Sequence, residues 1–171
     1  MKRFLRENKG KLNKGFSLVE MVVIVSLLVI VSSATIIGVS YISGKPAQQA
    51  ASRFSTLAQT DRNATMGKYK TELIIKQDST GTSAEEYFYS DASGVPSNNK
   101  ISKIADKHVI TEFSLDNVNW TPVDAAGVTV EFDRGTGALK NPSSDVYFRF
   151  TKAGYNYVIR IYHLTGKVAE Q

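Results

Sequence analysis

The most prominent feature of the sequence is a long apolar stretch near the amino terminus. The 24 residues 21–44 include no charged side chain and are rich in Val, Ile and Leu. At about 1.5 Å per residue they form roughly 36 Å of helix, whereas the hydrocarbon core of a bilayer is about 30 Å thick. A lone spanning segment satisfies its backbone groups in lipid only as a helix. The pattern therefore predicts a transmembrane α-helix over residues 16–44.

Residues 45–68 have a different, amphipathic pattern. Their apolar residues recur at helical spacing and are Ala47, Ala50, Ala51, Phe54, Leu57 and Ala58. Pro46 either starts this helical stretch or lies within one continuous helix, and Gly67 is a suitable terminator. We expect residues 45–68 to form the exposed half of the amino-terminal helix, with the apolar stripe against a globular domain.

From residue 69 onward apolar and polar residues alternate with a period of two, which is typical of half-buried strands. Clusters of Gly, Pro, Asn, Asp and Ser separate the alternating segments. The predicted strands are Thr71–Lys76, Glu86–Ser90, His108–Leu115, Trp120–Val123, Val128–Phe132, Val146–Thr151 and Tyr155–Leu164. The last two are close enough to form a hairpin over residues 152–154. The predicted fold class is α+β, with a long amino-terminal transmembrane helix packed on an antiparallel β-sheet domain at 69–171.

The charge distribution separates the first 15 residues from the rest of the chain. The whole sequence has a formal net charge of +5, and residues 1–15, with six Lys and Arg against one Glu, account for all of it. A basic segment before an apolar span keeps that end in the cytoplasm. The sequence thus predicts a single-pass membrane protein with a cytoplasmic amino terminus and an extracytoplasmic β-domain. Binding of nucleic acid to the short basic run Lys100, Lys103 and Lys107 is a weaker alternative.

The composition offers little material for enzymatic chemistry. The chain contains no Cys and only two His, His108 and His163, which both fall in predicted strands. No glycine-rich phosphate loop, HExxH pair or GxSxG elbow occurs. Glu85, Glu86 and Asp91 are expected in a solvated acidic loop, and the carboxyl-terminal aromatic residues in the core. We therefore predict a protein that is not an enzyme, with no catalytic residue, metal site or cofactor.

The segment Lys14-Gly15-Phe16-Ser17-Leu18-Val19-Glu20 places a carboxylate at the edge of the uncharged helix. With its basic leader, this segment resembles the signal of type IV prepilins and pseudopilins. That resemblance implies a pilin-like fold, cleavage after Gly15 by a prepilin peptidase, and N-methylation of Phe16. It also implies that Glu20 recruits and registers incoming subunits, so that residues 16–44 form the filament core. The new ammonium of Phe16 and the Glu20 carboxylate have opposite charges and can pair.

Two later segments resemble H-type minor pseudopilins of type II secretion. One covers residues 53–75, where the predicted helix ends and the first strand begins. The other comprises Val128–Gly137, with its Phe-Asp-Arg-Gly turn, and Ile159–Val168, with its Thr-Gly-Lys turn. Glycine turns between Val, Ile and Phe strands are also what any antiparallel sheet requires.

We therefore predict a structural subunit, minor or tip-proximal, of a type IV pilus or a type II secretion-like pseudopilus. The partners that the resemblance implies are the prepilin peptidase, other pilin subunits, a membrane assembly platform and, before assembly, membrane lipid. Other interpretations remain open: an adhesive or DNA-binding pilin, or an anchored β-domain that does not polymerise. An ordinary secretory signal, cleaved near Ser32-Ser33-Ala34, is a further alternative.

Overall fold

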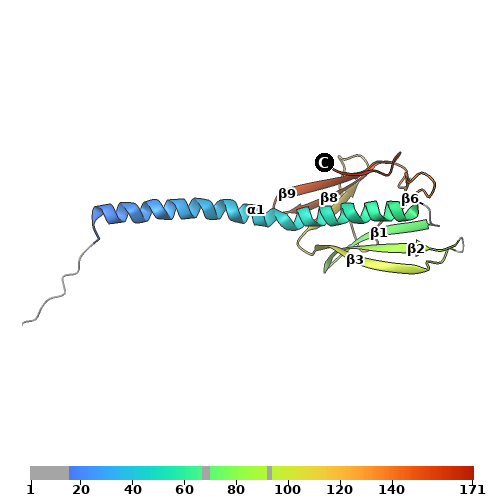
Figure 1. The fold of residues 1–171 in the computed structure, drawn as a ribbon, viewed down its shortest axis with the longest axis horizontal. Helices are drawn as coiled ribbons and strands as arrows, with labels where there is room; N and C mark the ends of the chain where they lie inside the picture. The colour runs from blue at the N-terminus through green and yellow to red at the C-terminus, as the bar shows by residue number, and fades with distance from the viewer. Residues whose placement is uncertain (1–15, 67–69, 92–93) are drawn as a thin grey trace, which may run out of the picture. The chain divides into compact units, whose positions relative to one another are not determined.

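The computed structural model describes residues 16–66, 70–91 and 94–171, while the side chains of residues 33–42 lie outside the description. The chain divides into two units, residues 1–40 and 41–171. The described residues form one helix and ten strands (Figure 1). The predicted leader, residues 1–15, lies outside the described residues.

Helix α1 spans Leu18–Thr65, 48 residues, and contains Pro46 in its interior. Of the two alternatives for Pro46, the structure thus has the one in which this residue lies within a continuous helix. Proline has no backbone N–H, so one helical hydrogen bond is absent there. The predicted terminator Gly67 lies outside the described residues, and α1 ends two residues before it.

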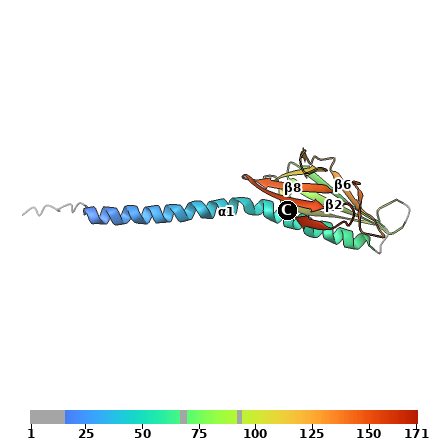
Figure 2. The ribbon, with the colours of Figure 1, turned by 90° about the horizontal axis from the view of Figure 1, so that it is seen from above.

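In the second unit, α1 runs along the strands (Figure 2), and it packs on them through one stripe of side chains. Five of them are fully buried: Ala47, Ala50, Ala51, Phe54 and Ala58. Alanines keep the helix backbone close to the strands, and Phe54 supplies the bulk. The centroid of its ring lies 4.6 Å from that of Phe148 and 5.7 Å from that of Phe150. This stripe confirms the apolar face predicted for the amphipathic stretch 45–68, of which α1 covers residues 45–65.

The first sheet has the strand order β3-β2-β1-β6-β7. Its pairs are all antiparallel. The strands are β1 (Lys70–Asp78), β2 (Gly81–Tyr89), β3 (Asn98–Asp106), β6 (Val128–Phe132) and β7 (Leu139–Asn141). In β1, Thr71, Leu73 and Ile75 are buried while the residues between them are half-buried, as a period of two predicts.

The second sheet has the order β10-β9-β8-β4-β5, also antiparallel throughout. Its strands are β4 (Ile110–Ser114), β5 (Thr121–Pro122), β8 (Val146–Lys152), β9 (Tyr155–Ile161) and β10 (Val168–Glu170). The predicted hairpin between β8 and β9 is confirmed. Its turn places Ala153 and Gly154 at φ 53° and 83°, the left-handed values that a two-residue hairpin turn requires.

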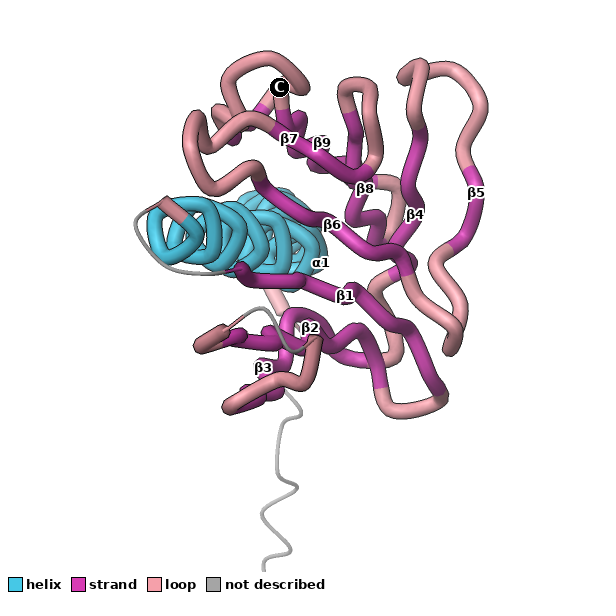
Figure 3. Tube along the Cα trace, turned by 90° about the vertical axis from the view of Figure 1, so that its right-hand side faces the viewer, coloured by secondary structure: helices cyan, strands magenta, loops and turns pink. Residues whose placement is uncertain are grey.

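The two sheets are joined to each other by hydrogen bonds and share one core with α1 (Figure 3). The hydroxyls of Thr82 on β2 and Thr111 on β4 lie 2.7 Å apart. The backbone N–H of Leu139 on β7 donates to the carbonyl of His163, beyond β9, at 2.8 Å. These two hydrogen bonds therefore connect the first sheet to the second sheet at two places.

The predicted fold class needs correction. The prediction was a pilin-like α+β fold in which a long apolar transmembrane helix packs on one antiparallel sheet. Instead, residues 41–171 are mostly β, with strands in two five-stranded sheets. Nor is α1 a long apolar helix, because its polar residues become frequent from Lys45 onward. Pairing between strands far apart in the sequence, such as β1 with β6, determines which strands belong to each of the two sheets.

The predicted single-pass membrane location is also corrected. Within the described parts of the chain, no helix combines the length and the apolar character that crossing a bilayer demands. The predicted span at 21–44 falls partly on residues 33–42, whose side chains are outside the description.

Candidate functional site

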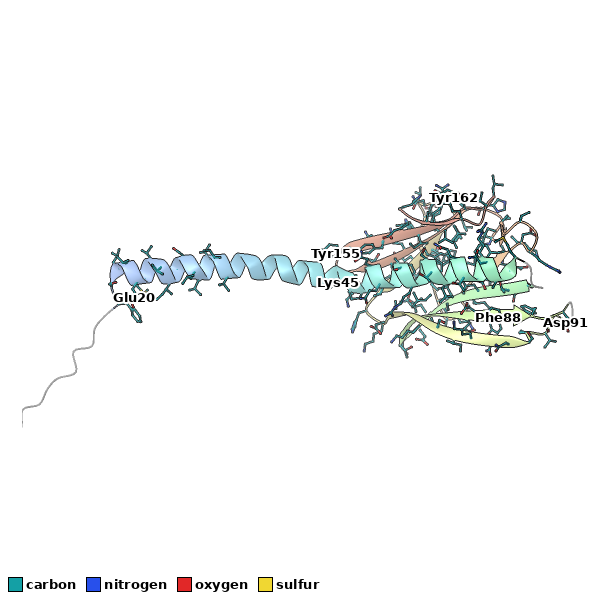
Figure 4. The ribbon with its side chains drawn as sticks, viewed as in Figure 1. Glu20, Lys45, Phe88, Asp91, Tyr155 and Tyr162 are labelled. Atoms are coloured by element: carbon teal, nitrogen blue, oxygen red, sulfur yellow. The ribbon has the colours of Figure 1, made fainter. Side chains whose placement is uncertain are left out.

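The start of α1 is closed by a reciprocal pair of hydrogen bonds. The backbone N–H of Glu20 donates to Ser17 Oγ at 3.2 Å, and the backbone N–H of Ser17 donates to Glu20 Oε2 at 3.4 Å. This is a capping box, in which two N–H groups that lack helical partners are satisfied together. Figure 4 shows Glu20 at this end of α1. Glu20 therefore has a local structural role, while Gly15 lies outside the described residues.

Apolar side chains cover the first unit's described helix on all sides. Those with large exposed fractions are Phe16, Leu18, Val19, Met21, Val22, Val23, Ile24, Val25, Leu27, Leu28, Val29, Ile30 and Val31. Phe16, the predicted cleavage and methylation residue, is 71% exposed. Ser26, a polar residue among them, donates its hydroxyl to the carbonyl of Val22 at 2.7 Å. An apolar surface of this extent marks an interaction site.

Arg62, near the end of α1, anchors two turns of the second unit. Its Nε donates to the carbonyl of Gly137 at 3.0 Å and to that of Thr165 at 3.1 Å. These carbonyls belong to the β6–β7 and β9–β10 turns, which lie in the two segments that resemble H-type pseudopilins, one with a Phe-Asp-Arg-Gly turn and the other with a Thr-Gly-Lys turn. Gly166, at φ 61°, has no room for a side chain, because a Cβ there would lie 1.8 Å from the Gly137 carbonyl oxygen. In this chain, the two motifs thus hold the helix to both sheets.

Two buried carboxylates, Asp61 and Glu86, lie on α1 and on the first sheet. Asp61 on α1 is 0% exposed, and neither of its carboxylate oxygens has a hydrogen-bond partner. Burial raises the pKa of Asp61 to about 7; the nearby Thr71 hydroxyl opposes this rise and the charge of Glu86 adds to it. Glu86 on β2 is also buried, and its Oε2 accepts no hydrogen bond.

Glu86 lies in a groove of about 400 Å³ between α1 and the edge strand β3, which we call the α1–β3 groove. The volume is in the range of small-molecule sites. Its wall combines hydroxyl groups, basic side chains and one apolar residue: Ser52, Arg53, Thr56, Leu57, Thr60, Lys100, Ser102 and Lys103. The nearest cation to Glu86 is Lys100, whose Nζ lies 3.6 Å from Oε2.

Sequence reasoning missed this groove for two reasons. Residues 98–106 form β3, whereas the sequence suggested a turn followed by a basic run, so that Lys100 and Lys103 were not placed on a strand. Glu85 and Glu86 were expected together in a solvated loop, yet they lie on opposite faces of β2. Glu85 pairs with Lys76 at 2.7 Å, while Glu86 is buried. The sequence signal that could have indicated a buried polar site was Asp61, a carboxylate that continues the apolar stripe of α1.

The remaining predicted features are distributed over the second unit. Both histidines lie in turns rather than in the predicted strands: His108 between β3 and β4, and His163 between β9 and β10. Of the aromatic residues expected in the core, Phe148 and Phe150 are buried, whereas Tyr155 is exposed. Tyr162 packs on the Arg160 guanidinium at 4.1 Å. Among the described residues, no three His, Asp or Glu side chains gather in a way that would hold a metal ion.

Comparisons with models of protein families, with curated proteins and with solved structures find no match to this chain. The functional interpretation therefore depends on the residues and their geometry alone.

Proposed function

We propose that this chain is a structural subunit, minor or tip-proximal, of a type IV pilus or a type II secretion-like pseudopilus. It is cleaved after Gly15 by a prepilin peptidase and joins the filament through the amino-terminal part of α1. Its partners are other pilin or pseudopilin subunits and the assembly platform. The observation that carries the proposal is the segment Gly15-Phe16 with Glu20 four residues later, followed by exposed apolar side chains on every side of the helix.

The charges of the leader support a processing step. Cleavage after Gly15 removes the entire formal net charge of +5 and creates an ammonium group on Phe16. From residue 16 to residue 44, the groups of the remaining chain that are charged at neutral pH are that ammonium and Glu20. A bundle of such helices buries the apolar side chains of Leu18–Val31, and burial of this kind contributes about 25 cal/mol per Å².

Within such a bundle, Glu20 has a partner only if the helices adopt a suitable stagger. An unpaired carboxylate surrounded by apolar side chains costs several kcal/mol, so the pair between Glu20 and the Phe16 ammonium of a neighbour favours one register. The capping box explains Glu20 without any filament, because it serves an isolated helix equally well. An experiment must therefore separate the charge of Glu20 from its capping role.

The first experiment determines the mass and the amino-terminal sequence of the protein recovered from its native cells. The proposal expects a chain that starts at Phe16 and is heavier by one methyl group. A start at Thr35 would mean ordinary secretion. An intact Met1 terminus, in cells with an active prepilin peptidase, would also contradict the proposal.

The second experiment compares filament assembly by three variants that accumulate to the same level. Glu20→Gln keeps a side chain able to cap the helix but removes the charge, and Ser17→Ala removes the cap but keeps the charge. We expect Glu20→Ala and Glu20→Gln to lose filaments and Ser17→Ala to retain them. If Glu20→Gln assembles normally, capping is the role of this residue and the proposed inter-subunit pair is wrong.

A further inference from the structure

The α1–β3 groove has an acidic floor that the protein itself leaves incompletely satisfied. The Glu86 side chain is only 3% exposed, yet its Oε2 accepts no hydrogen bond, and Lys100 Nζ at 3.6 Å belongs to a side chain that is 66% exposed. Buried carboxylates in proteins normally accept hydrogen bonds, because an unsatisfied one loses its hydration without compensation. The charge of Glu86 also contributes to the raised pKa of Asp61, a buried carboxyl on α1 that does not line the groove.

Three of the described residues that line the groove are basic: Arg53, Lys100 and Lys103. Lys103 Nζ pairs with Asp106 Oδ1 at 2.5 Å. Arg53 also acts on Asp106, since its charge and that of Lys103 both lower the pKa of that carboxyl. Lys100 Nζ, at 3.6 Å from Oε2, is the basic group that pairs with Glu86 among the described residues lining the groove.

The hydroxyls of the wall are suited to accept hydrogen bonds from a ligand. Thr56 Oγ1 donates to the carbonyl of Ser52 at 2.9 Å, and Thr60 Oγ1 donates to the carbonyl of Thr56 at 2.8 Å. Each hydroxyl hydrogen is thus used within the helix, so both oxygens have only acceptor capacity left. Leu57 lies on the same wall and offers contact to an aliphatic chain.

We propose that the α1–β3 groove binds a primary ammonium group carried on an aliphatic chain, with Glu86 as its principal acceptor. An ammonium has three donors and no acceptor, which matches a carboxylate oxygen and hydroxyl oxygens whose hydrogens are already engaged. A metal ion fits less well, because Glu86 is the one carboxylate among the described residues that line the groove. The same chemistry is offered by a small amine and by a lysine side chain of another polypeptide.

The test uses the full chain and follows backbone amide signals of residues around the groove by NMR. The probes are n-butylammonium, which represents a free amine, and Nα-acetyl-lysine methylamide, which represents a lysine side chain in a polypeptide. Their neutral and anionic counterparts are n-butanol and butyrate. We expect saturable shifts with one or both amines and none with the counterparts. The tighter of the two amines identifies the source of the ligand.

Three variants locate the binding. Glu86→Gln should weaken amine binding at least about tenfold, since a hydrogen bond to a charged group is lost. Glu85→Gln, on the opposite face of the same strand, is the matched control and should bind normally. Lys100→Met should strengthen binding, because it removes the cation that competes for Glu86.

Other outcomes would overturn the proposal. Binding of butyrate that Lys100→Met abolishes would make the groove an anion site, and equal binding of n-butanol would make it an apolar one. If Glu86→Gln alters the fold, the Leu57→Trp variant tests the site instead. This substitution fills the groove and leaves the Glu86 carboxylate in place. Amine binding that survives Leu57→Trp contradicts the site.

Discussion

The buried carboxyl of Asp61 leads to a specific prediction about pH and stability. Burial raises its pKa from 3.8 to about 7 in the folded protein. One pKa unit corresponds to about 1.4 kcal/mol, so a difference of about three units between unfolded and folded states amounts to about 4 kcal/mol. This is an upper value, since local rearrangement and water reduce such penalties.

The sign follows from proton binding. The folded protein binds the Asp61 proton more tightly than the unfolded chain does, so acid favours folding through this group. Its contribution is fully present below about pH 4 and decreases as the pH rises toward 7. Carboxyls with a lowered pKa, such as Asp145 beside Arg160, act in the opposite direction and lose their contribution as the pH falls.

The perturbation is Asp61→Asn, which keeps the size of the side chain and cannot ionise. We expect it to raise the free energy of unfolding at pH 8 by about 1–4 kcal/mol relative to the natural chain, and to change it little at pH 4.5. Urea unfolding followed by far-UV circular dichroism at both pH values measures this difference. Because the other carboxyls are common to both proteins, the comparison isolates Asp61.

Asp106→Asn is the control, since this carboxylate is exposed and pairs with Lys103 at the surface. It should leave the free energy of unfolding at pH 8 nearly unchanged, because exposed ion pairs contribute little. The reasoning would be refuted if Asp61→Asn were less stable than the natural chain at pH 8, or if its advantage did not grow with pH. Either result would mean that Asp61 is ionised and well paired in the folded protein.

Three further predictions concern how α1 is held to the second unit, and urea unfolding measures each of them. Arg62→Met should lower the free energy of unfolding by about 2–3 kcal/mol, because two turn carbonyls lose their donor; an unchanged value would mean that water replaces the guanidinium. Gly166→Ala should strongly destabilise the protein, because the new Cβ would meet the Gly137 carbonyl oxygen. Gly154 has open space around it, so Gly154→Ala should cost only about 1 kcal/mol, from the strain of a left-handed backbone. Equal effects of the two variants would show that the contact at Gly166 relaxes. Phe54→Ala should lower the free energy of unfolding by about 3–5 kcal/mol, since the Phe54 ring is fully buried and packs against Phe148 and Phe150 of β8. A much smaller loss would mean that neighbouring side chains move in to fill the cavity.

Much of the local structure was determined by the sequence alone. The spacing of Ala47, Phe54 and Ala58 predicts which face of α1 is buried, because helical periodicity depends only on backbone geometry. Alternation predicts β6 and β8 for the same reason, since neighbouring side chains of a strand point to opposite faces. The strand β3 was missed because it lies at the edge of its sheet, where exposed residues such as Lys100 and Ile101 hide the alternation.

Only the tertiary structure decided how these elements combine. Periodicity shows which side of a strand is buried but not which strand is its neighbour, so the division into two sheets depended on distant pairs such as β4 with β8. The same holds for the α1–β3 groove. Asp61 and Glu86 are separated by 25 positions and lie on different elements, and no local pattern relates them. Packing of α1 on the first sheet excludes water from both carboxylates, and that burial determines their chemistry.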